Sequence, residues 1–148
     1  DRHHNFTLVA ANVKQVSQFA KIDNEQFRLL KSLAPGPYTF IFEAKRSVPN
    51  RLIHPKRRTI GVRIPDHAIV QELLKELGEP IMSSSLILPD QTLAIGDPEE
   101  IRDSLEHHVD LIIDGGLVTN SASTVLDWHD KNLTVVRHGA GDIGFLEE

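Results

Sequence analysis

The sequence predicts an α/β domain of three layers, in which a twisted mixed parallel and antiparallel sheet carries helices on both faces. Segments rich in β-branched and aromatic residues alternate with segments of helical periodicity. Connections through helices favour parallel strand pairs, whereas the polar turn 129–132 favours a hairpin near the C-terminus. With 148 residues, the chain is long enough for a single domain, 1–148, with a hydrophobic core.

Strands are expected where β-branched and aromatic residues cluster. These segments are 5–9, 38–42, 59–64, the start of 81–88, 109–113, 124–128 and 134–137. Helices are expected where a capping residue precedes helical periodicity. The expected helices are 12–20, the segment from Asp23 to the residue before Pro35, 67–77 and 97–107. Their expected caps are Asn12, Asp23, Asp66 and Asp97, and Gly78 ends the third helix.

Composition excludes several functional classes. Apolar residues make up 40% of the chain and charged residues 25%, as in a soluble globular protein. No apolar run is long enough to span a membrane, and the first residues do not form a signal peptide, so we expect no membrane partner and a cytoplasmic location. Because cysteine is absent, disulfides, thiolate metal sites and cysteine nucleophiles are excluded. A monomer or a dimer is compatible with this composition.

The distribution of charge suggests a local anionic ligand. The net charge of −5 argues against general nucleic-acid binding. Between Glu43 and Asp66, however, there is no acidic residue and there are seven basic ones. Six of them form the basic segment, which has two equally weighted interpretations: a surface for an anion such as RNA, or a solvated loop that covers apolar surface. These six residues are Lys45, Arg46, Arg51, Lys56, Arg57 and Arg58.

Two further arginines lie on or at the ends of predicted strands. Arg63 follows Gly61 in an apolar strand, and an arginine there needs an anionic partner if it is buried, although an edge position facing water is the alternative. Arg137 ends a strand beside Gly139, where α/β sheets commonly bind ligands. The serine turns 83–85 and 121–124 could surround phosphate oxygens, but on residue types alone they are polar loops.

Histidine spacing does not indicate a metal site. The adjacent pairs His3-His4 and His107-His108 lack the separation that places two ligands on one helix face, so no metal ligand is expected. A serine hydrolase is also disfavoured, because no Gly-x-Ser-x-Gly elbow is present.

Six motifs follow one another along nearly the whole chain. They are Pro35–Ile41 (PGPYTFI), Thr59–His67 (TIGVRIPDH), Glu79–Ser85 (EPIMSSS), Val109–Gly116 (VDLIIDGG), Ser123–Asp127 (STVLD) and Val136–Gly139 (VRHG). In this order they resemble the threonylcarbamoyl-AMP synthase-like family, the YrdC-like domains, and most of all its YciO-type branch. The resemblance implies a YrdC-like mixed sheet around a basic concave cavity.

The resemblance also implies an activity. Family members are nucleotidyltransferases that condense L-threonine, bicarbonate and ATP into threonylcarbamoyl-AMP, with Mg²⁺ accompanying the ATP and pyrophosphate released. The product serves the N6-threonylcarbamoyladenosine modification of tRNA, and some members are linked to RNA binding. By position in the motifs, nucleotide binding falls on Thr59, Ser83, Ser85 and Arg137, and threonine binding falls on Arg63 and Ser123. No catalytic side chain is assigned.

The chain departs from the family pattern at two places. The family's N-terminal strand–helix segment, with its Lys-x-Arg pair, would precede Asp1, so that segment is expected to be missing from this sequence. The family's Ser-Ala-Asn turn is replaced by Ser85-Leu86-Ile87, so nucleotide contacts there should differ. The alternatives to a synthase are a non-catalytic module of the same fold that binds a nucleotide, tRNA or double-stranded RNA, and a folded fragment without activity.

Overall fold

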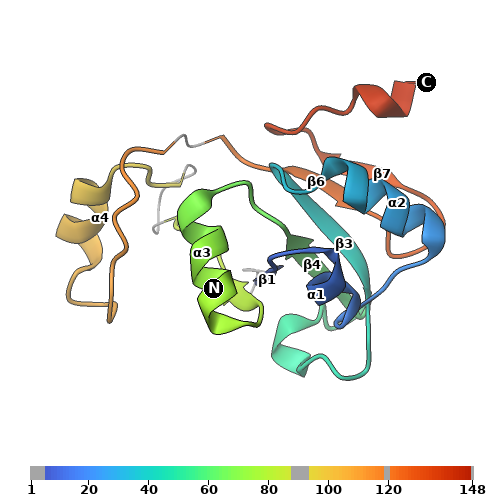
Figure 1. Cartoon of the computed structure of the whole chain (residues 1–148), viewed down its shortest axis with the longest axis horizontal. Coiled ribbons are helices and arrows are strands. Elements are labelled where there is room, and N and C mark those ends of the chain that lie inside the picture. The colour runs from blue at the N-terminus through green and yellow to red at the C-terminus, as the bar shows by residue number, and fades with distance from the viewer. Residues whose placement is uncertain (1–5, 88–93, 119–120, 148) are drawn as a thin grey trace. The chain divides into compact units, whose positions relative to one another are not determined.

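The computed structural model describes residues 6–87, 94–118 and 121–147 (Figure 1). The chain divides into two compact units. Unit 1 comprises residues 1–84 and 122–148, and unit 2 comprises residues 85–121.

Unit 1 is built on one mixed sheet, as the sequence predicts. Within the described residues the sheet has seven strands in the order β5-β1-β4-β3-β6-β7, and β2 pairs with β3. The strands are β1 Thr7–Val9, β2 Ala20–Lys21, β3 Tyr38–Ala44, β4 Thr59–Arg63, β5 Ile81–Ser83, β6 Thr124–Asp127 and β7 Thr134–Arg137. The pairs β1–β4 and β3–β6 are parallel, and the other pairs are antiparallel. The predicted β6–β7 hairpin is confirmed.

Helices begin largely where side-chain caps predict them. The longer elements are α1 Val13–Ser17, α2 Asn24–Leu33, α3 Ala68–Leu77 and, in unit 2, α4 Pro98–Leu105; two 3₁₀ turns are η1 Asn50–Leu52 and η2 Gly144–Glu147. The Asp23 carboxylate accepts the Gln26 backbone N–H at 2.8 Å, and the Gln26 side chain accepts the Asp23 backbone N–H at 3.0 Å. This reciprocal pair is the capping box expected from the spacing. Asp97 caps α4 by accepting the Glu99 N–H at 3.0 Å.

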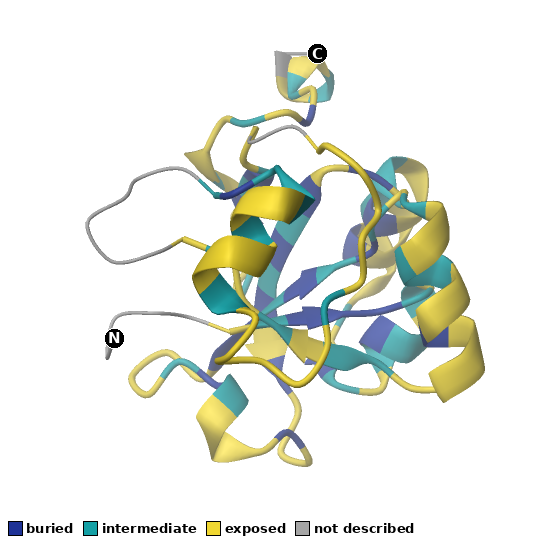
Figure 2. Ribbon diagram, turned by 90° about the vertical axis from the view of Figure 1, so that its left-hand side faces the viewer, coloured by how far each residue is buried: buried dark blue, intermediate teal, exposed yellow. Residues whose placement is uncertain are grey.

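The hydrophobic core lies on one face of the sheet. Alternate residues of β3, such as Phe40 and Phe42, are buried, and their rings stack with centroids 5.9 Å apart. Val16 of α1 and Leu30 of α2 are fully buried against the same cluster, so these two helices cover this face. Figure 2 shows the buried residues gathered on the central strands.

The opposite face of the sheet carries small and polar residues. Thr7, Thr39 and Gly61 alternate with the core residues of β1, β3 and β4. A carbon atom added at Gly61 would lie 3.7 Å from Thr39 Cγ2 and 3.7 Å from Thr7 Oγ1. The two threonines therefore flank a strand position without a side chain on this face, here called the polar face.

Unit 2 is held by backbone contacts around α4. The Ile95 N–H donates to the Leu86 carbonyl at 3.1 Å, and the Val118 N–H donates to the Gly96 carbonyl at 3.0 Å. Any side chain at Gly96 would overlap the Val118 carbonyl oxygen, so glycine is required at this close approach. Among the described residues of both units, no helix is long and apolar enough to cross a membrane.

Three local predictions are wrong. Asp66 does not cap α3; the N-cap is His67, which makes no side-chain capping bond. Residues 109–113 form no strand and Leu111 is 75% exposed, because the described part of unit 2 has no strand with which they could pair. The first predicted helix ends at Ser17 because the chain turns into β2, which is too short to show a periodic pattern.

The two aspartates provide a matched test of capping. Asp23→Ala should lower the free energy of unfolding by about 1 kcal/mol, because the Gln26 backbone N–H in the first turn of α2 loses its side-chain acceptor. Asp66→Ala, which removes an aspartate before α3 without a capping bond, should change it by less than about 0.5 kcal/mol. Urea unfolding measures both values, and equal losses would contradict the assignment of the caps.

Candidate functional site

Two arginines share one row across the polar face. β6 pairs Thr39 with Val125, and β7 pairs Val125 with Arg137. In the β3–β4 register Phe40 opposes Val62, which places Thr39 opposite Arg63. Because directly opposed residues point to the same face, the row Arg63–Thr39–Val125–Arg137 lies on the polar face.

A β-bulge determines the position of Arg137. Leu126 pairs with Val135, but Val125 pairs with Arg137, so Val136 is an extra residue in β7. Without the bulge the register would place Arg137 opposite Thr124, whose neighbour Tyr38 belongs to the core face. The bulge therefore moves Arg137 to the polar face, on the same side as Arg63.

Two hydroxyl groups connect the middle of the row to Arg137. The Arg137 guanidinium donates from Nε to the Ser123 carbonyl at 3.0 Å and from Nη2 to Ser123 Oγ at 3.2 Å. Ser123 Oγ lies 2.7 Å from Thr39 Oγ1. The structure thus joins Arg137, Ser123 and Thr39 in one hydrogen-bonded chain.

The positive charges of the row have no carboxylate partner among the residues that the structure describes. Burial, and in second place the nearby charge of Arg137, lowers the pKa of Arg63 below its usual value. The Arg63 Nε is buried without a hydrogen-bond partner, and within residues 6–87, 94–118 and 121–147 no carboxylate forms an ion pair with either arginine. Paired guanidinium groups without counter-charges are suited to bind a carboxylate or a phosphate.

The other predicted site residues lie at different places. Ser83 belongs to β5, where it pairs with Thr7, and its hydroxyl donates to the Thr7 carbonyl at 3.1 Å. Thr59 is on the polar face, about 13 Å along β4 from Arg63, and is only 4% exposed. Ser85 is exposed in unit 2, so unit 1 alone does not bring it together with the row.

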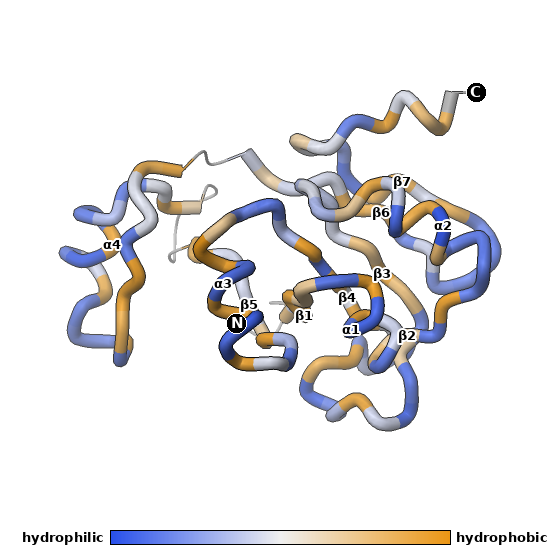
Figure 3. Tube along the Cα trace, in the orientation of Figure 1, coloured by the Kyte–Doolittle hydropathy of each residue, from blue (hydrophilic) through white to orange (hydrophobic). Residues whose placement is uncertain are grey.

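The basic segment forms an exposed loop between β3 and β4. All six of its cationic residues are exposed, while Val48 and Ile53 between them are buried and anchor the loop. Figure 3 shows this mixture of hydrophilic and hydrophobic residues along the loop. Of the six, Arg57 alone has an ion-pair partner within the described part of the chain, Asp127 at 3.2 Å.

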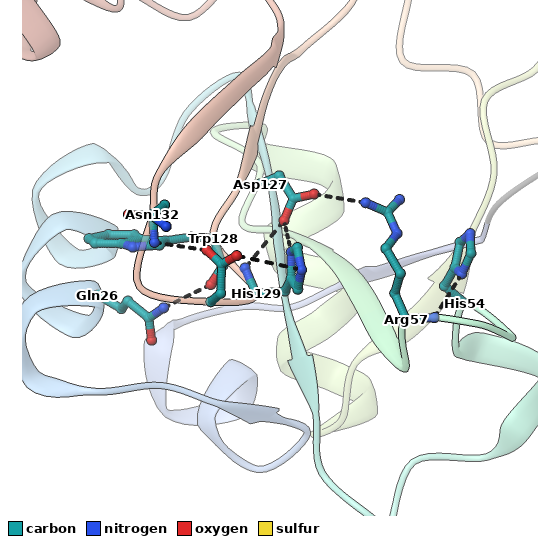
Figure 4. A network of polar contacts seen from close by, with 8 residues as sticks. Gln26, His54, Arg57, Asp127, Trp128, His129 and Asn132 are labelled. Carbon is teal, nitrogen blue, oxygen red and sulfur yellow. Dashed lines mark hydrogen bonds and ion pairs between the residues drawn. The ribbon is translucent and has the colours of Figure 1, made fainter.

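Asp127 is a buried polar residue that the sequence analysis missed as a separate feature. Its carboxylate accepts from Arg57 Nη1 at 3.2 Å and contacts His129 Nδ1 at 2.6 Å (Figure 4). His54 Nδ1 in turn accepts the Arg57 N–H at 3.2 Å. Asp127 therefore fastens the basic segment to the hairpin turn. In the sequence, the one sign of such a buried carboxylate is its position at the end of an apolar strand, next to Trp128.

Two pockets flank the hairpin turn away from the row. One of about 640 Å³ lies between α2, the turn and η2, with Trp128 and Phe145 in its wall. The other, of about 530 Å³, is lined by His129 and by charged residues of β2 and the turn. Neither contains Arg63 or Arg137. Among the described residues, which exclude His3 and His4, no group of three metal-ligating side chains is assembled.

Comparisons with known proteins identify the family of the chain. Residues 1–139 match the Sua5/YciO/YrdC family model, described as "Telomere recombination". "Uncharacterized protein YciO" of Escherichia coli is 48% identical over 140 residues, which are 95% of this chain and 68% of that protein. The threonylcarbamoyl-AMP synthase of Bos taurus is 39% identical over 95 residues, 64% of this chain and 33% of that enzyme.

Solved structures show the same fold. The crystal structure of E. coli YciO superposes with a TM-score of 0.89 at 48% identity, covering 95% of this chain and 68% of that chain. P. abyssi Sua5 complexed with L-threonine superposes with a TM-score of 0.87 at 25% identity, covering 97% of this chain and 42% of that chain.

The uncompensated charge of Arg63 should reduce stability. Because its pKa is lower in the fold than in the unfolded chain, the charged form is disfavoured by folding; this cost is present throughout the neutral range and falls only as the pH rises toward the lowered pKa. Arg63→Met should therefore raise the free energy of unfolding by about 1 kcal/mol at pH 7. The measurement is urea unfolding, and the control is Arg28→Met, at an exposed position of α2. A loss of stability in Arg63→Met would contradict this interpretation.

Proposed function

Because the chain belongs to the Sua5/YciO/YrdC family, we propose that it forms threonylcarbamoyl-AMP from L-threonine, bicarbonate and ATP. The product would serve the threonylcarbamoyl modification of adenosine in tRNA. The observation that carries the proposal is the pair Arg63 and Arg137, which share one row of the polar face without counter-charges among the described residues. The threonine bound by P. abyssi Sua5, a structural relative, supports an amino-acid ligand here.

The two arginines would have separate anionic partners. Arg63, partly buried, would bind the carboxylate of threonine through its planar N–H groups. Arg137, exposed and oriented by Ser123, would bind the α-phosphate region of the nucleotide. Ser123 would contact the threonine and its new carbonyl group. Thr59 and Ser83 would border the nucleotide along the strands of unit 1.

The chemistry requires orientation and charge stabilisation rather than a protein nucleophile. The threonine amine adds to the bicarbonate carbon and water leaves; the resulting carbamate oxygen attacks the α-phosphorus of ATP and pyrophosphate leaves. Guanidinium and hydroxyl donors held on a rigid sheet would stabilise the negative charge that builds on the phosphate. Mg²⁺ would enter with ATP, because this ion is commonly held by substrate phosphates and water.

Removal of Arg137 tests the proposal. Arg137→Ala should lower kcat/KM for threonine-dependent pyrophosphate release by at least about a hundredfold, because a donor to the developing charge is lost. L-Threonine binding should persist, since Arg63 is unchanged. The assay uses protein expressed from the complete gene, with ATP, Mg²⁺, threonine and bicarbonate, and identifies the adenylate by mass.

The matched control for that assay is Arg28→Ala, an exposed arginine of α2 outside the row, which should keep the wild-type rate. Wild-type protein that forms no threonine-dependent adenylate would overturn the synthase proposal. A rate unchanged in Arg137→Ala would overturn the role of the row.

A non-catalytic RNA-binding module is the second candidate function. It is favoured by five exposed cationic residues of the basic segment that have no ion-pair partner within the described ranges: Lys45, Arg46, Arg51, Lys56 and Arg58. Such a cluster attracts phosphates and releases counterions on binding. Tethering by Asp127 would hold the segment in one place on the surface.

The salt dependence of binding tests this second function. Replacing Lys45, Arg46 and Arg51 together by Gln should weaken binding of double-stranded RNA or tRNA. The slope of log K against log salt should fall by about 2 to 3, since each neutralised contact contributes about 0.7–0.9. The control replaces Lys14, Lys31 and Lys75 by Gln, with the same change in net charge on three separate helices. Equal slopes for the two triple variants would exclude the basic segment as the contact surface.

A further inference from the structure

We propose that Thr39 is a positioning residue, whose hydroxyl group donates to Ser123 Oγ and thereby directs the Ser123 proton toward the bound anion. This inference rests on the proposed function of the row and adds a residue to which that function assigned no role. Thr39 would act through Ser123.

Thr39 occupies the middle of the row. The strand register puts Arg63 on one side of it and Val125, followed by Arg137, on the other. Its Cγ2 lies 3.7 Å from where a side chain at Gly61 would begin, and its Oγ1 lies 2.7 Å from Ser123 Oγ. Because a β-branched side chain is restricted at χ1, seating the methyl group toward Gly61 also fixes the direction of the hydroxyl.

The number of hydrogen-bonding sites on Ser123 determines where its proton can point. A serine hydroxyl accepts two hydrogen bonds and donates one. Arg137 Nη2 can only donate, so it occupies one acceptor position of Ser123 Oγ at 3.2 Å. If Thr39 donates as well, both acceptor positions are filled, and the Ser123 proton is free for a third partner. In the opposite arrangement, that proton is used on Thr39 and cannot reach a ligand.

An anion favours the first arrangement. Arg63, Arg137 and Ser123 then all present hydrogen-bond donors to the same region, and no lone pair of Ser123 opposes the negative charge. An ionised carboxylate or phosphate oxygen can only accept hydrogen bonds, so it needs donors around it. With Thr39 and Arg137 occupying both acceptor positions, Ser123 can only donate toward the ligand. This restriction would make the row selective for anions.

Substitution at Thr39 provides the test. Thr39→Val keeps the size and branching but removes the hydroxyl, so the dissociation constants for L-threonine and for inorganic pyrophosphate should rise about five- to tenfold. Thr39→Ser restores the hydroxyl and should bind within about twofold of wild type. Isothermal titration calorimetry measures both ligands, and Thr134→Val, an exposed strand threonine outside the row, is the matched control.

A second pair of variants shows whether Thr39 acts through Ser123. In a Ser123→Ala background, Thr39→Val should cause no further loss of affinity, because the group that it positions is gone. A purely structural role would give the same loss in both backgrounds and would not be rescued by Thr39→Ser. Either of these results overturns the inference and leaves the proposed function intact. Wild-type protein that binds neither threonine nor pyrophosphate overturns both.

Discussion

The extra residue in β7 is the constraint on which the candidate site depends. Side chains alternate between the two faces of a sheet, so a shift of one residue decides whether Arg137 lies on the core face or the polar face. The bulge at Val136 places it on the polar face, where Arg63, Thr39 and Ser123 complete the arrangement. A regular hairpin of the same sequence would direct a charged side chain toward the core face and leave Arg63 alone on its row.

The same strands serve stability and binding on opposite faces. Phe40 and Val62 are buried in the core, while their neighbours Thr39 and Arg63 face the polar side. The core residues hold the strands in register. Their packing offsets the cost of the Arg63 guanidinium, whose Nε is buried without a hydrogen-bond partner among the described residues. An arrangement that weakens the fold locally, and that persists because the surrounding packing is strong, is common at binding sites.

Sequence reasoning succeeded where the determining interactions are local. The caps at Asn12 and Asp23 involve residues three apart, so spacing alone located the starts of α1 and α2. The mixed sheet and the positions of Arg63 and Arg137 on strands also followed from the pattern. The bulge, Thr39 and Asp127 could not be found in this way, because each depends on a partner from another strand or loop. Residues 109–113 show the converse: they have the pattern of a strand, but the described part of unit 2 contains no strand to pair with them, and they form none.

The two proposed anion surfaces lie at opposite ends of β3 and can therefore act independently. The row crosses β3 at Thr39, whereas the basic segment follows Ala44, at the lower end of the strand in Figure 1. Asp127, which holds Arg57, is about 7 Å along β6 from Val125 of the row. Ala44, after which Lys45 and Arg46 follow, is about 17 Å along β3 from Thr39. A separation longer than the Debye length of about 8–10 Å screens exposed charges from one another. Charge changes at Lys45 and Arg46 should therefore alter contacts with a large polyanion without altering the field at the row, so a synthase reaction and RNA binding are compatible in one chain.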